Sequence, residues 1–210
     1  MKYPGNLNKQ LQKQVDHYTT TIASNPNDSK AYVMRGMLKF KMGEIYGSIT
    51  DFDTAEKLEP TITPYLWQRG ISYYYADKFA EGAKQFETDL QVNSKDIEET
   101  VWRYLCISRF HSIDEARKSL LPIKDDPRLV MQRVYELYVG NSSIEDVLAV
   151  GNPFNKRPKF YSHLYVGLYF EAVNEMDKAQ DYITKAADKY QINDYMWYLA
   201  CVHKNLRGWE

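Results

Sequence analysis

The residue types that most often ligate metals are sparse in this sequence and poorly spaced for the task. The four histidines are His17, His111, His163 and His203. No two of them lie four residues apart, the spacing that places two imidazoles on one helix face, and no cysteine or carboxylate set adds ligands at metal-site spacing. The sequence therefore predicts no metal site and no cofactor.

Nucleophilic and acid–base chemistry have equally little support. Cys106 and His111 are five residues apart and lie on different helix faces. The alternative to a non-enzymatic protein is an enzyme whose site, such as a thiol–imidazole pair, is assembled by folding. The acidic sets at residues 51–53 and 125–126 are more typical of solvated faces or helix caps than of paired catalytic acids. No G-x-x-x-x-G-K-[ST], G-x-G-x-x-G or G-x-S-x-G motif occurs. We therefore expect no catalytic residues and no enzyme.

Aromatic side chains, by contrast, are abundant and clustered. Residues 66–82 read LWQRGISYYYADKFAEG, with Trp67, Tyr73, Tyr74, Tyr75 and Phe79 close together on an expected helix and turn. The chain has 18 tyrosines, and tyrosine combines an apolar ring with a polar tip that suits half-buried grooves and interfaces. These rings either fill the core or face a partner, depending on how the helices that carry them pack.

An internal repeat supplies those helices. Residues 32–60 align with residues 66–94 at an offset of 34 residues, and residues 163–191 form a third copy. The glycines at the shared place are Gly36, Gly70 and Gly167. This period and pattern resemble the tetratricopeptide repeat (TPR), a helix–turn–helix unit that buries its apolar face only by stacking. The resemblance implies an all-α right-handed superhelix of antiparallel helix pairs, with degenerate TPR-like units in the middle.

The sequence predicts a single domain over residues 1–210. Its parts are a half unit over 7–27, TPR units over 29–62 and 63–96, degenerate helix pairs over 97–122 and 127–151, a loop over 151–159, a TPR unit over 160–193 and a closing helix over 194–207. Proline and glycine interrupt the period around the second degenerate pair. Ser142 is expected to cap the helix that follows it, with Glu145 three residues on.

The TPR resemblance also divides the aromatic side chains between core and surface. The first helix of each TPR unit lines the concave face of the stack, and in this register Tyr73 and Phe79 are expected to pack in the core instead. The residues expected to form a partner-binding groove are Met37, Phe40, Lys41, Trp67, Gln68, Ile71, Tyr74 and Tyr75. Trp and Tyr are typical binding anchors. Alternatively, the terminal helices of this chain fill the groove, or a homodimer closes it.

One TPR subclass binds the C-terminal carboxylate of chaperones through lysine, asparagine and arginine side chains at fixed repeat positions. Here those positions hold Val33, Met37, Gln68, Glu98 and Trp102. None of these side chains supplies the positive charge that pairs with a carboxylate. We therefore expect a partner other than a chaperone tail.

Beyond the repeat, the order of four sequence blocks resembles the new lipoprotein I family of bacterial outer-membrane TPR proteins. The blocks read RGISYYYADKFAEGAKQF, VWRYLCISRF, ELYVGNSSIEDVL and SHLYVGLYFEAVNEMDKAQDYITKAA. The resemblance covers residues 29–206 and implies a mixed TPR and TPR-like fold, often homodimeric, in an adaptor that gathers proteases and cell-wall hydrolases. The residues given include no lipid-attachment cysteine and no signal peptide, so we expect a departure from that family in this respect.

Charge and hydropathy limit the classes of partner. The chain carries 27 basic and 28 acidic side chains, a net charge of −1, which argues against binding the phosphate backbone of nucleic acids. No run approaches the ~20 apolar residues of a membrane span, so we expect no membrane insertion and a cytoplasmic location. The sequence thus predicts a non-enzymatic adaptor for a protein or peptide. An assembly factor for a membrane complex and a self-associating homodimer are the alternatives.

Overall fold

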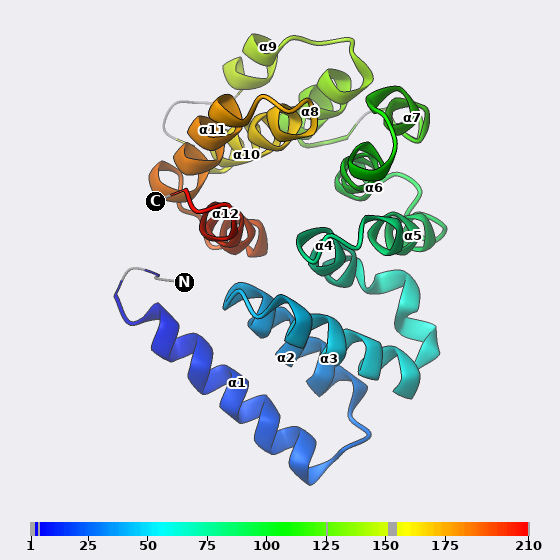
Figure 1. Ribbon diagram of the computed structural model, residues 1–210, viewed down its shortest axis with the longest axis vertical. Coiled ribbons are helices and arrows are strands. Elements are labelled where there is room, and N and C mark those ends of the chain that lie inside the picture. Colours follow the sequence, from blue (N-terminus) through cyan, green and yellow to red (C-terminus); the bar gives the residue numbers. More distant parts are fainter. Residues whose placement is uncertain (1–2, 4, 125, 151–154, 210) are drawn as a thin grey trace. The chain divides into compact units, whose positions relative to one another are not determined.

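The computed structural model describes residues 3, 5–124, 126–150 and 155–209, and every regular element within these ranges is helical (Figure 1). The fold is an all-α, TPR-like repeat, as the 34-residue period predicts. Contacts within the chain delimit two compact units, unit 1 over Met1–Val92 and unit 2 over Asn93–Glu210. The boundary falls inside the predicted repeat 63–96, in a chain for which the sequence alone predicts one domain.

Unit 1 consists of successive antiparallel helices. Its elements are α1 (Leu7–Ser24), α2 (Ser29–Lys41), α3 (Ile45–Leu58), the 3₁₀ helix η1 (Pro60–Tyr65), α4 (Trp67–Tyr75) and α5 (Phe79–Asp89). α2 packs along α3 and α4 along α5, while α1 packs on α2. Within the unit predicted over 63–96, α4 begins only at Trp67, and Pro60 and Pro64 lie in the tighter 3₁₀ turn that precedes it.

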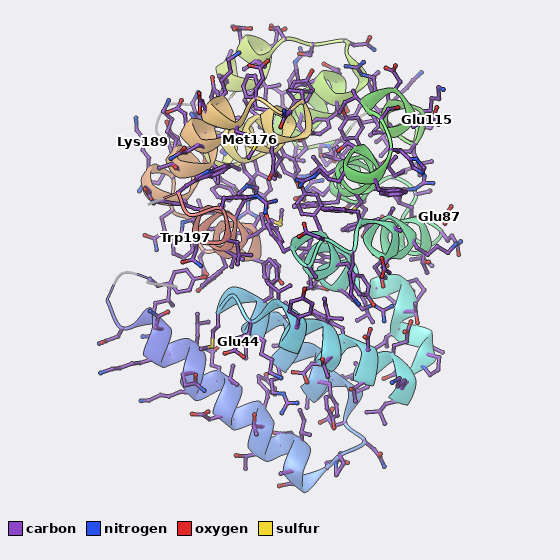
Figure 2. All side chains as sticks on the ribbon, viewed as in Figure 1. Glu44, Glu87, Glu115, Met176, Lys189 and Trp197 are labelled. Carbon is purple, nitrogen blue, oxygen red and sulfur yellow. The ribbon has the colours of Figure 1, made fainter. Side chains whose placement is uncertain are left out.

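Unit 2 combines one regular helix pair with shorter helices. Its elements are α6 (Ile97–Phe110), α7 (Ile113–Lys118), α8 (Leu129–Val139), α9 (Ile144–Ala149), α10 (Lys156–Ala172), α11 (Met176–Lys189) and α12 (Tyr195–Leu206). α10 packs along α11, and α12 closes on α11, where the Trp197 indole nitrogen donates to the Ala187 carbonyl at 2.9 Å (Figure 2). The helices α7 and α9 have only six residues each, against 14 in α11.

The same turn joins the two helices of each matched repeat. The residue at the turn has a positive φ in all three copies, at Gly43 (80°), Asp77 (58°) and Asn174 (62°). The next backbone amide then donates to a carbonyl of the preceding helix at 2.8–2.9 Å in every case. Glycine, aspartate and asparagine are residues that adopt this left-handed conformation most readily, so the turn has a local cause in the sequence.

The shared glycines lie where the two helices of a repeat cross. A Cβ atom added at Gly70 would come within 2.7 Å of the Phe86 ring, and one at Gly167 within 2.7 Å of the Ile183 side chain. Both distances are too short for a side chain, so these positions require glycine for close packing. The contacts support the repeat register in both units.

The predicted loop over 151–159 differs from the structure. Residues 151–154 lie outside the described residues, and α10 already begins at Lys156. The side chain of Asn155 accepts a hydrogen bond from the Arg157 amide and so caps the helix at its first turn. Pro158 is compatible with this first turn because amides there have no partner within the helix.

The cap of α9 lies one residue beyond the predicted one. Ser143, rather than Ser142, is the N-cap, and its hydroxyl accepts from the Asp146 amide at 3.1 Å. The Asp146 carboxylate accepts in return from the Ser143 amide at 3.0 Å. Aspartate therefore takes the reciprocal place that the sequence analysis gives to Glu145.

Candidate functional site

The residues predicted to form the groove contact one another across α2 and α4. The ring centroids of Phe40 and Tyr75 are 5.7 Å apart, and those of Tyr74 and Tyr75 are 5.4 Å apart. The Gln68 amide nitrogen lies 3.8 Å from the Met37 sulfur. The repeat register therefore brings together side chains that are far apart in sequence.

These side chains do not form an open surface. Phe40, Ile71 and Tyr74 are fully buried, and Gln68 and Tyr75 keep only 9% and 8% exposure. The prediction that all eight residues face a partner therefore differs from the structure for these five. Removing apolar rings from water stabilises the chain, so a dense aromatic cluster favours burial.

Three of the eight residues keep accessible surface. Met37, Lys41 and Trp67 are half-buried and lie on the first helix of two consecutive repeats. We call these three residues the accessible edge. Their role in binding a partner stays a prediction.

Tyr73 and Phe79, which the sequence assigns to the core, are half-buried. The Tyr73 hydroxyl donates to the Asp53 carboxylate at 3.0 Å, and its ring centroid lies 5.8 Å from the Arg69 guanidinium carbon. Partial burial raises the pKa of Tyr73 to about 12. The hydroxyl group of Tyr73 thus holds this ring at the boundary between α3 and α4, whereas the ring of the neighbouring Tyr74 is buried.

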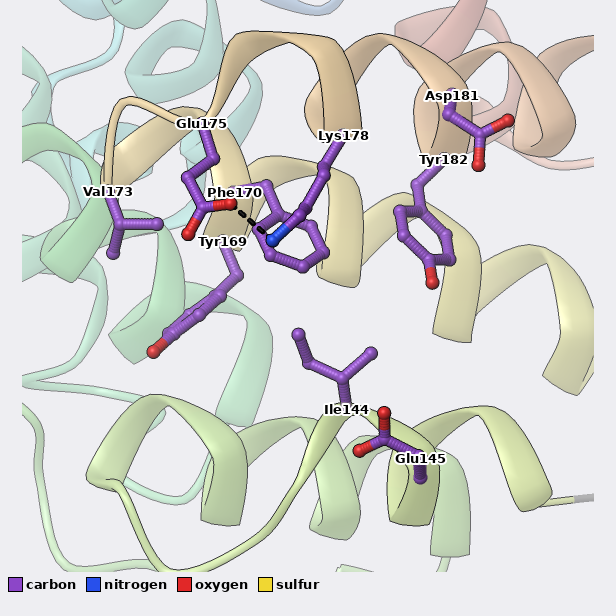
Figure 3. Close-up of a pocket in the computed structure, with 9 residues that line it drawn as sticks. All are labelled: Ile144, Glu145, Tyr169, Phe170, Val173, Glu175, Lys178, Asp181 and Tyr182. Carbon is purple, nitrogen blue, oxygen red and sulfur yellow. Dashed lines mark ion pairs between the residues drawn. The ribbon is translucent and has the colours of Figure 1, made fainter.

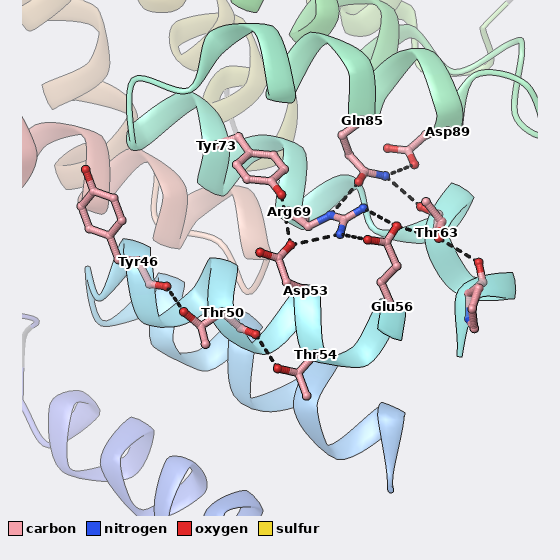
Figure 4. A network of polar contacts seen from close by, with 11 residues as sticks. Tyr46, Thr50, Asp53, Thr54, Glu56, Thr63, Arg69, Tyr73, Gln85 and Asp89 are labelled. Atoms are coloured by element: carbon pink, nitrogen blue, oxygen red, sulfur yellow. Dashed lines mark hydrogen bonds and ion pairs between the residues drawn. The ribbon is translucent and has the colours of Figure 1, made fainter. Parts of the chain in front are cut away.

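Arg69 is the centre of a polar network that the sequence analysis did not identify (Figure 4). Its guanidinium donates to both oxygens of Glu56 at 2.7 and 2.9 Å and to Gln85 at 2.8 Å, and it also pairs with Asp53 at 3.2 Å. Only 6% of Arg69 is exposed. The network joins α3, α4 and α5 within unit 1 through charge-assisted hydrogen bonds.

Arg35 occupies the same repeat position one unit earlier. It donates to both oxygens of Asp51 at 2.7 and 2.8 Å, and Lys39 pairs with the same carboxylate at 2.8 Å. Arg35 to Asp51 and Arg69 to Gln85 both span 16 residues, so one geometry recurs with different partners. Asp51 is therefore buried and paired, a correction to the expectation of a solvated face.

The second acidic set also differs from the expected solvated face or cap, because the Asp126 side chain is only 6% exposed and Arg128, not Asp126, is the N-cap residue of α8. Asp126 accepts a hydrogen bond from the Arg128 amide at 2.7 Å and pairs with its guanidinium at 2.9 Å. Asp125 lies outside the described residues. Asp126 therefore acts as a local turn residue just before α8.

A buried carboxyl lies at the end of the Arg69 network. Asp89 is fully buried and accepts from the Gln85 amide at 2.6 Å, while its second oxygen has no hydrogen-bond partner within the described residues. Burial raises the pKa of Asp89 to about 7. This position holds a small residue in the TPR pattern, so the carboxyl is an exception to the repeat.

Unit 2 has its own buried charge cluster. The Glu171 carboxylate on α10 accepts from Arg207 of α12 at 2.7 Å, and it lies 3.4 Å from Arg109 of α6 and 3.6 Å from His203. Burial lowers the pKa of His203 to about 4. This cluster links three helices and leaves His203 neutral near pH 7.

The described residues of unit 2 also form an open pocket between α9, α10 and α11 (Figure 3). Its volume is about 660 Å³, within the roughly 300–1,000 Å³ usual for ligand pockets. Its lining consists of Ile144, Glu145, Tyr169, Phe170, Val173, Glu175, Lys178, Asp181 and Tyr182. No pattern in the sequence indicated this site.

The thiols lie in environments that disfavour the reactive thiolate. Cys106 is fully buried, and burial raises its pKa well above the ordinary value. Burial also raises the pKa of Cys201 to about 12.

Among the residues that the structure describes, no group of three or more His, Cys, Asp and Glu side chains has metal-site geometry, and no helix has the length and hydrophobicity to cross a bilayer.

Comparisons with known proteins give distant similarities. No family model matches the chain. "Protein SGT1 homolog" from Bos taurus is 23% identical over 95 residues, which is 45% of this chain and 28% of that protein. "Hsp70-Hsp90 organizing protein 3" from Arabidopsis thaliana is 25% identical over 84 residues, which is 40% of this chain and 15% of that protein. The chain thus spans less than a third of the length of either relative.

Proposed function

We propose that this chain is a non-enzymatic adaptor that binds a protein or peptide on the face shared by α2 and α4. The observation that carries the proposal is the accessible edge of Met37, Lys41 and Trp67, backed by buried rings. The tryptophan and the methionine supply apolar contact area, and the lysine supplies a charged group that orients the partner. The buried ring pair of Phe40 and Tyr75 fixes the helices that carry this edge.

The two relatives support a role in protein interaction. The name of the second relative says that it organizes Hsp70 and Hsp90, and similarity to it favours an adaptor over an enzyme. The positions that hold a chaperone carboxylate in the TPR subclass described above are occupied here by residues such as Val33 and Glu98. We therefore propose a partner other than a chaperone tail.

The resemblance to the new lipoprotein I family supports the same adaptor class. The family assignment, the cytoplasmic location and the absence of binding to nucleic acid are parts of this proposal. The alternatives from the sequence, an assembly factor for a membrane complex and a homodimer with an occluded groove, make different predictions for partner identity and for mass in solution.

Capture of partners from a lysate of the source cells, read by mass spectrometry and followed by binding of the purified partner, tests the proposal. Wild type is compared with the double variant Met37→Ala/Trp67→Ala and with Lys41→Glu. Both changes affect half-buried side chains, so folding is expected to survive and is checked by circular dichroism. We expect binding of the purified partner to weaken at least about tenfold, because interface anchors of this type each contribute ~2 kcal/mol.

Tyr46→Ala is the matched control, because Tyr46 is 69% exposed on α3 and is not part of the accessible edge. Equal binding by the control and the edge variants would overturn the proposal. Capture of this chain alone, with a mass that doubles as concentration rises, would instead support the homodimer.

A further inference from the structure

The pocket of unit 2 lies at the start of the short helix α9. In the first repeat the second helix, α3, has 14 residues, whereas α9 has six and contributes only Ile144 and Glu145 to the pocket wall. The rings of Tyr169 and Tyr182 on α10 and α11 are half-buried. The pocket therefore combines an accessible aromatic wall with a narrow opposite wall (Figure 3).

The aromatic wall is ordered by ring contacts. Phe170 and Tyr182 stack with centroids 5.6 Å apart and planes inclined by 20°. Tyr169 meets the fully buried Tyr138 edge to face at 5.5 Å, which anchors it from behind. Rings held in this way present fixed faces, and the face of an aromatic ring attracts cations.

Two lysines of this chain already place their ammonium groups over rings of this wall. The Lys178 ammonium lies 5.0 Å from the Phe170 centroid and pairs with Glu175. The Lys185 ammonium lies 5.4 Å from the Tyr182 centroid and pairs with Asp181 at 2.6 Å. Each site combines a ring with a carboxylate around one cation.

One carboxylate of the pocket remains for an incoming group. Glu145 has no ion-pair partner within the described ranges, and its carboxylate points into the space between α9 and α11 (Figure 3). The lining holds three carboxylates against the one ammonium of Lys178, so it favours a cation over an anion. Ile144 and Val173 add apolar surface for an alkyl chain.

We propose that this pocket binds an arginine side chain of a partner protein, with the guanidinium paired to Glu145 beside the Phe170–Tyr182 stack. Arginine fits better than lysine because its planar guanidinium both stacks on aromatic rings and donates two parallel hydrogen bonds to one carboxylate. Its methylene groups cover Ile144. The inference rests on the proposed adaptor function but uses none of the residues of the accessible edge.

Titration of the ¹⁵N-labelled full chain with the synthetic peptide Ac-Ala-Leu-Arg-Leu-Ala-NH₂, followed by NMR, tests the inference. We expect amide shifts in α9, the end of α10 and the start of α11. The same peptide with citrulline in place of arginine keeps the shape but loses the charge. We expect it to bind at least about fivefold more weakly, because charge-assisted hydrogen bonds and cation–π contacts are lost.

Two pairs of variants locate the contact. Glu145→Gln is expected to weaken the arginine peptide at least about fivefold, whereas Glu81→Gln, an equal change at an exposed residue of α5, is expected to have no effect. Tyr182→Phe keeps the ring and is expected to bind, while Tyr182→Leu is expected to lose affinity. The spectrum of each free variant reports its folding.

Absence of shifts at millimolar peptide, shifts confined to unit 1, or equal binding of the citrulline peptide would each overturn the inference. None of these results would affect the proposed function, which is measured by loss of a partner in the accessible-edge variants. Loss of that partner's binding in Glu145→Gln as well would show that one partner uses both surfaces and would support the inference.

Discussion

The two units use the same helix-pair geometry but different polar groups. In unit 1, Arg35 and Arg69 sit at one repeat position and bind partners 16 residues later. In unit 2, the corresponding position is Val166, and a buried Glu171 with Arg109, His203 and Arg207 links the helices instead. The turn and the close helix crossing at glycine are therefore common to both units, whereas the polar contacts between helices differ from one unit to the other.

The largest expected effect comes from removing the large side chain at the crossing. Phe86→Ala in unit 1 and Ile183→Ala in unit 2 are each expected to lower the free energy of unfolding by about 3–4 kcal/mol, because both side chains are fully buried against a glycine. Urea unfolding followed by circular dichroism measures the change. Tyr46→Ala is the control, and a loss as small as that of the control in either unit would contradict the shared geometry.

Adding a methyl group at the crossing is expected to have a smaller effect. Gly70→Ala and Gly167→Ala would each place a Cβ 2.7 Å from a facing side chain, so we expect a loss of about 2 kcal/mol despite the better helix propensity of alanine. Gly47→Ala is the matched control, because its Cβ would meet only the flexible Lys39 side chain. Thermal unfolding of the three variants measures this order of stabilities. An equal gain in stability in all three would contradict close packing at the two crossings.

The polar links are expected to differ in strength. Glu171→Gln removes a carboxylate that is only 1% exposed and weakens its charged contacts, so we expect a loss of about 2 kcal/mol. Arg69→Met leaves Glu56 and Asp53, which are 34% and 39% exposed and can be hydrated, so we expect about 1 kcal/mol. Urea unfolding at low and high salt compares them, and a larger loss for Arg69→Met would reverse the ranking.

The two units are also expected to contribute opposite pH dependences. The pKa of Asp89 is raised from 3.8 to about 7, so between these values the folded chain holds a proton that the unfolded chain has released, and stability falls as pH rises. The pKa of His203 is lowered from 6.5 to about 4, so the unfolded chain binds the extra proton there, and stability rises with pH. Each slope is at most about 1.4 kcal/mol per pH unit.

Urea unfolding between pH 4.5 and pH 7.5 separates the two contributions. Asp89→Asn is expected to abolish the falling slope and to stabilise the chain at pH 7.5 relative to pH 5. His203→Gln is expected to abolish the rising slope below about pH 6.5. If either variant leaves the pH dependence of wild type unchanged, the corresponding group does not titrate as its burial indicates.

The fold was predictable because its determinants are local in the sequence. A glycine at each crossing and a residue suited to positive φ at each turn recur at the same repeat positions, and the structure places both as the register requires. The cap of α9 was missed by one residue because Ser142 and Ser143 are both good caps. The start of α10 was missed because proline and glycine in the preceding segment indicated a longer loop.

The candidate sites were less predictable because they depend on packing. Register alone places Tyr73 in the core and Tyr74 on a surface, but the Tyr73 hydroxyl reaches Asp53, and Tyr74 is the buried ring. The pocket of unit 2 depends on how the start of α9 lies against α10 and α11, which no spacing in the sequence specifies. Sequence patterns thus indicated which residues share a face, whereas solvent exposure depended on the folded chain.

Hydrogen-exchange mass spectrometry of the chain, alone and with its purified captured partner, tests the central claim most directly. The claim is that a protein partner binds the face shared by α2 and α4. The account predicts slower amide exchange in peptides that cover Met37–Lys41 and Trp67–Tyr75 when the partner is present, and no such slowing in Met37→Ala/Trp67→Ala. Unchanged exchange in these peptides with a partner bound elsewhere would contradict it.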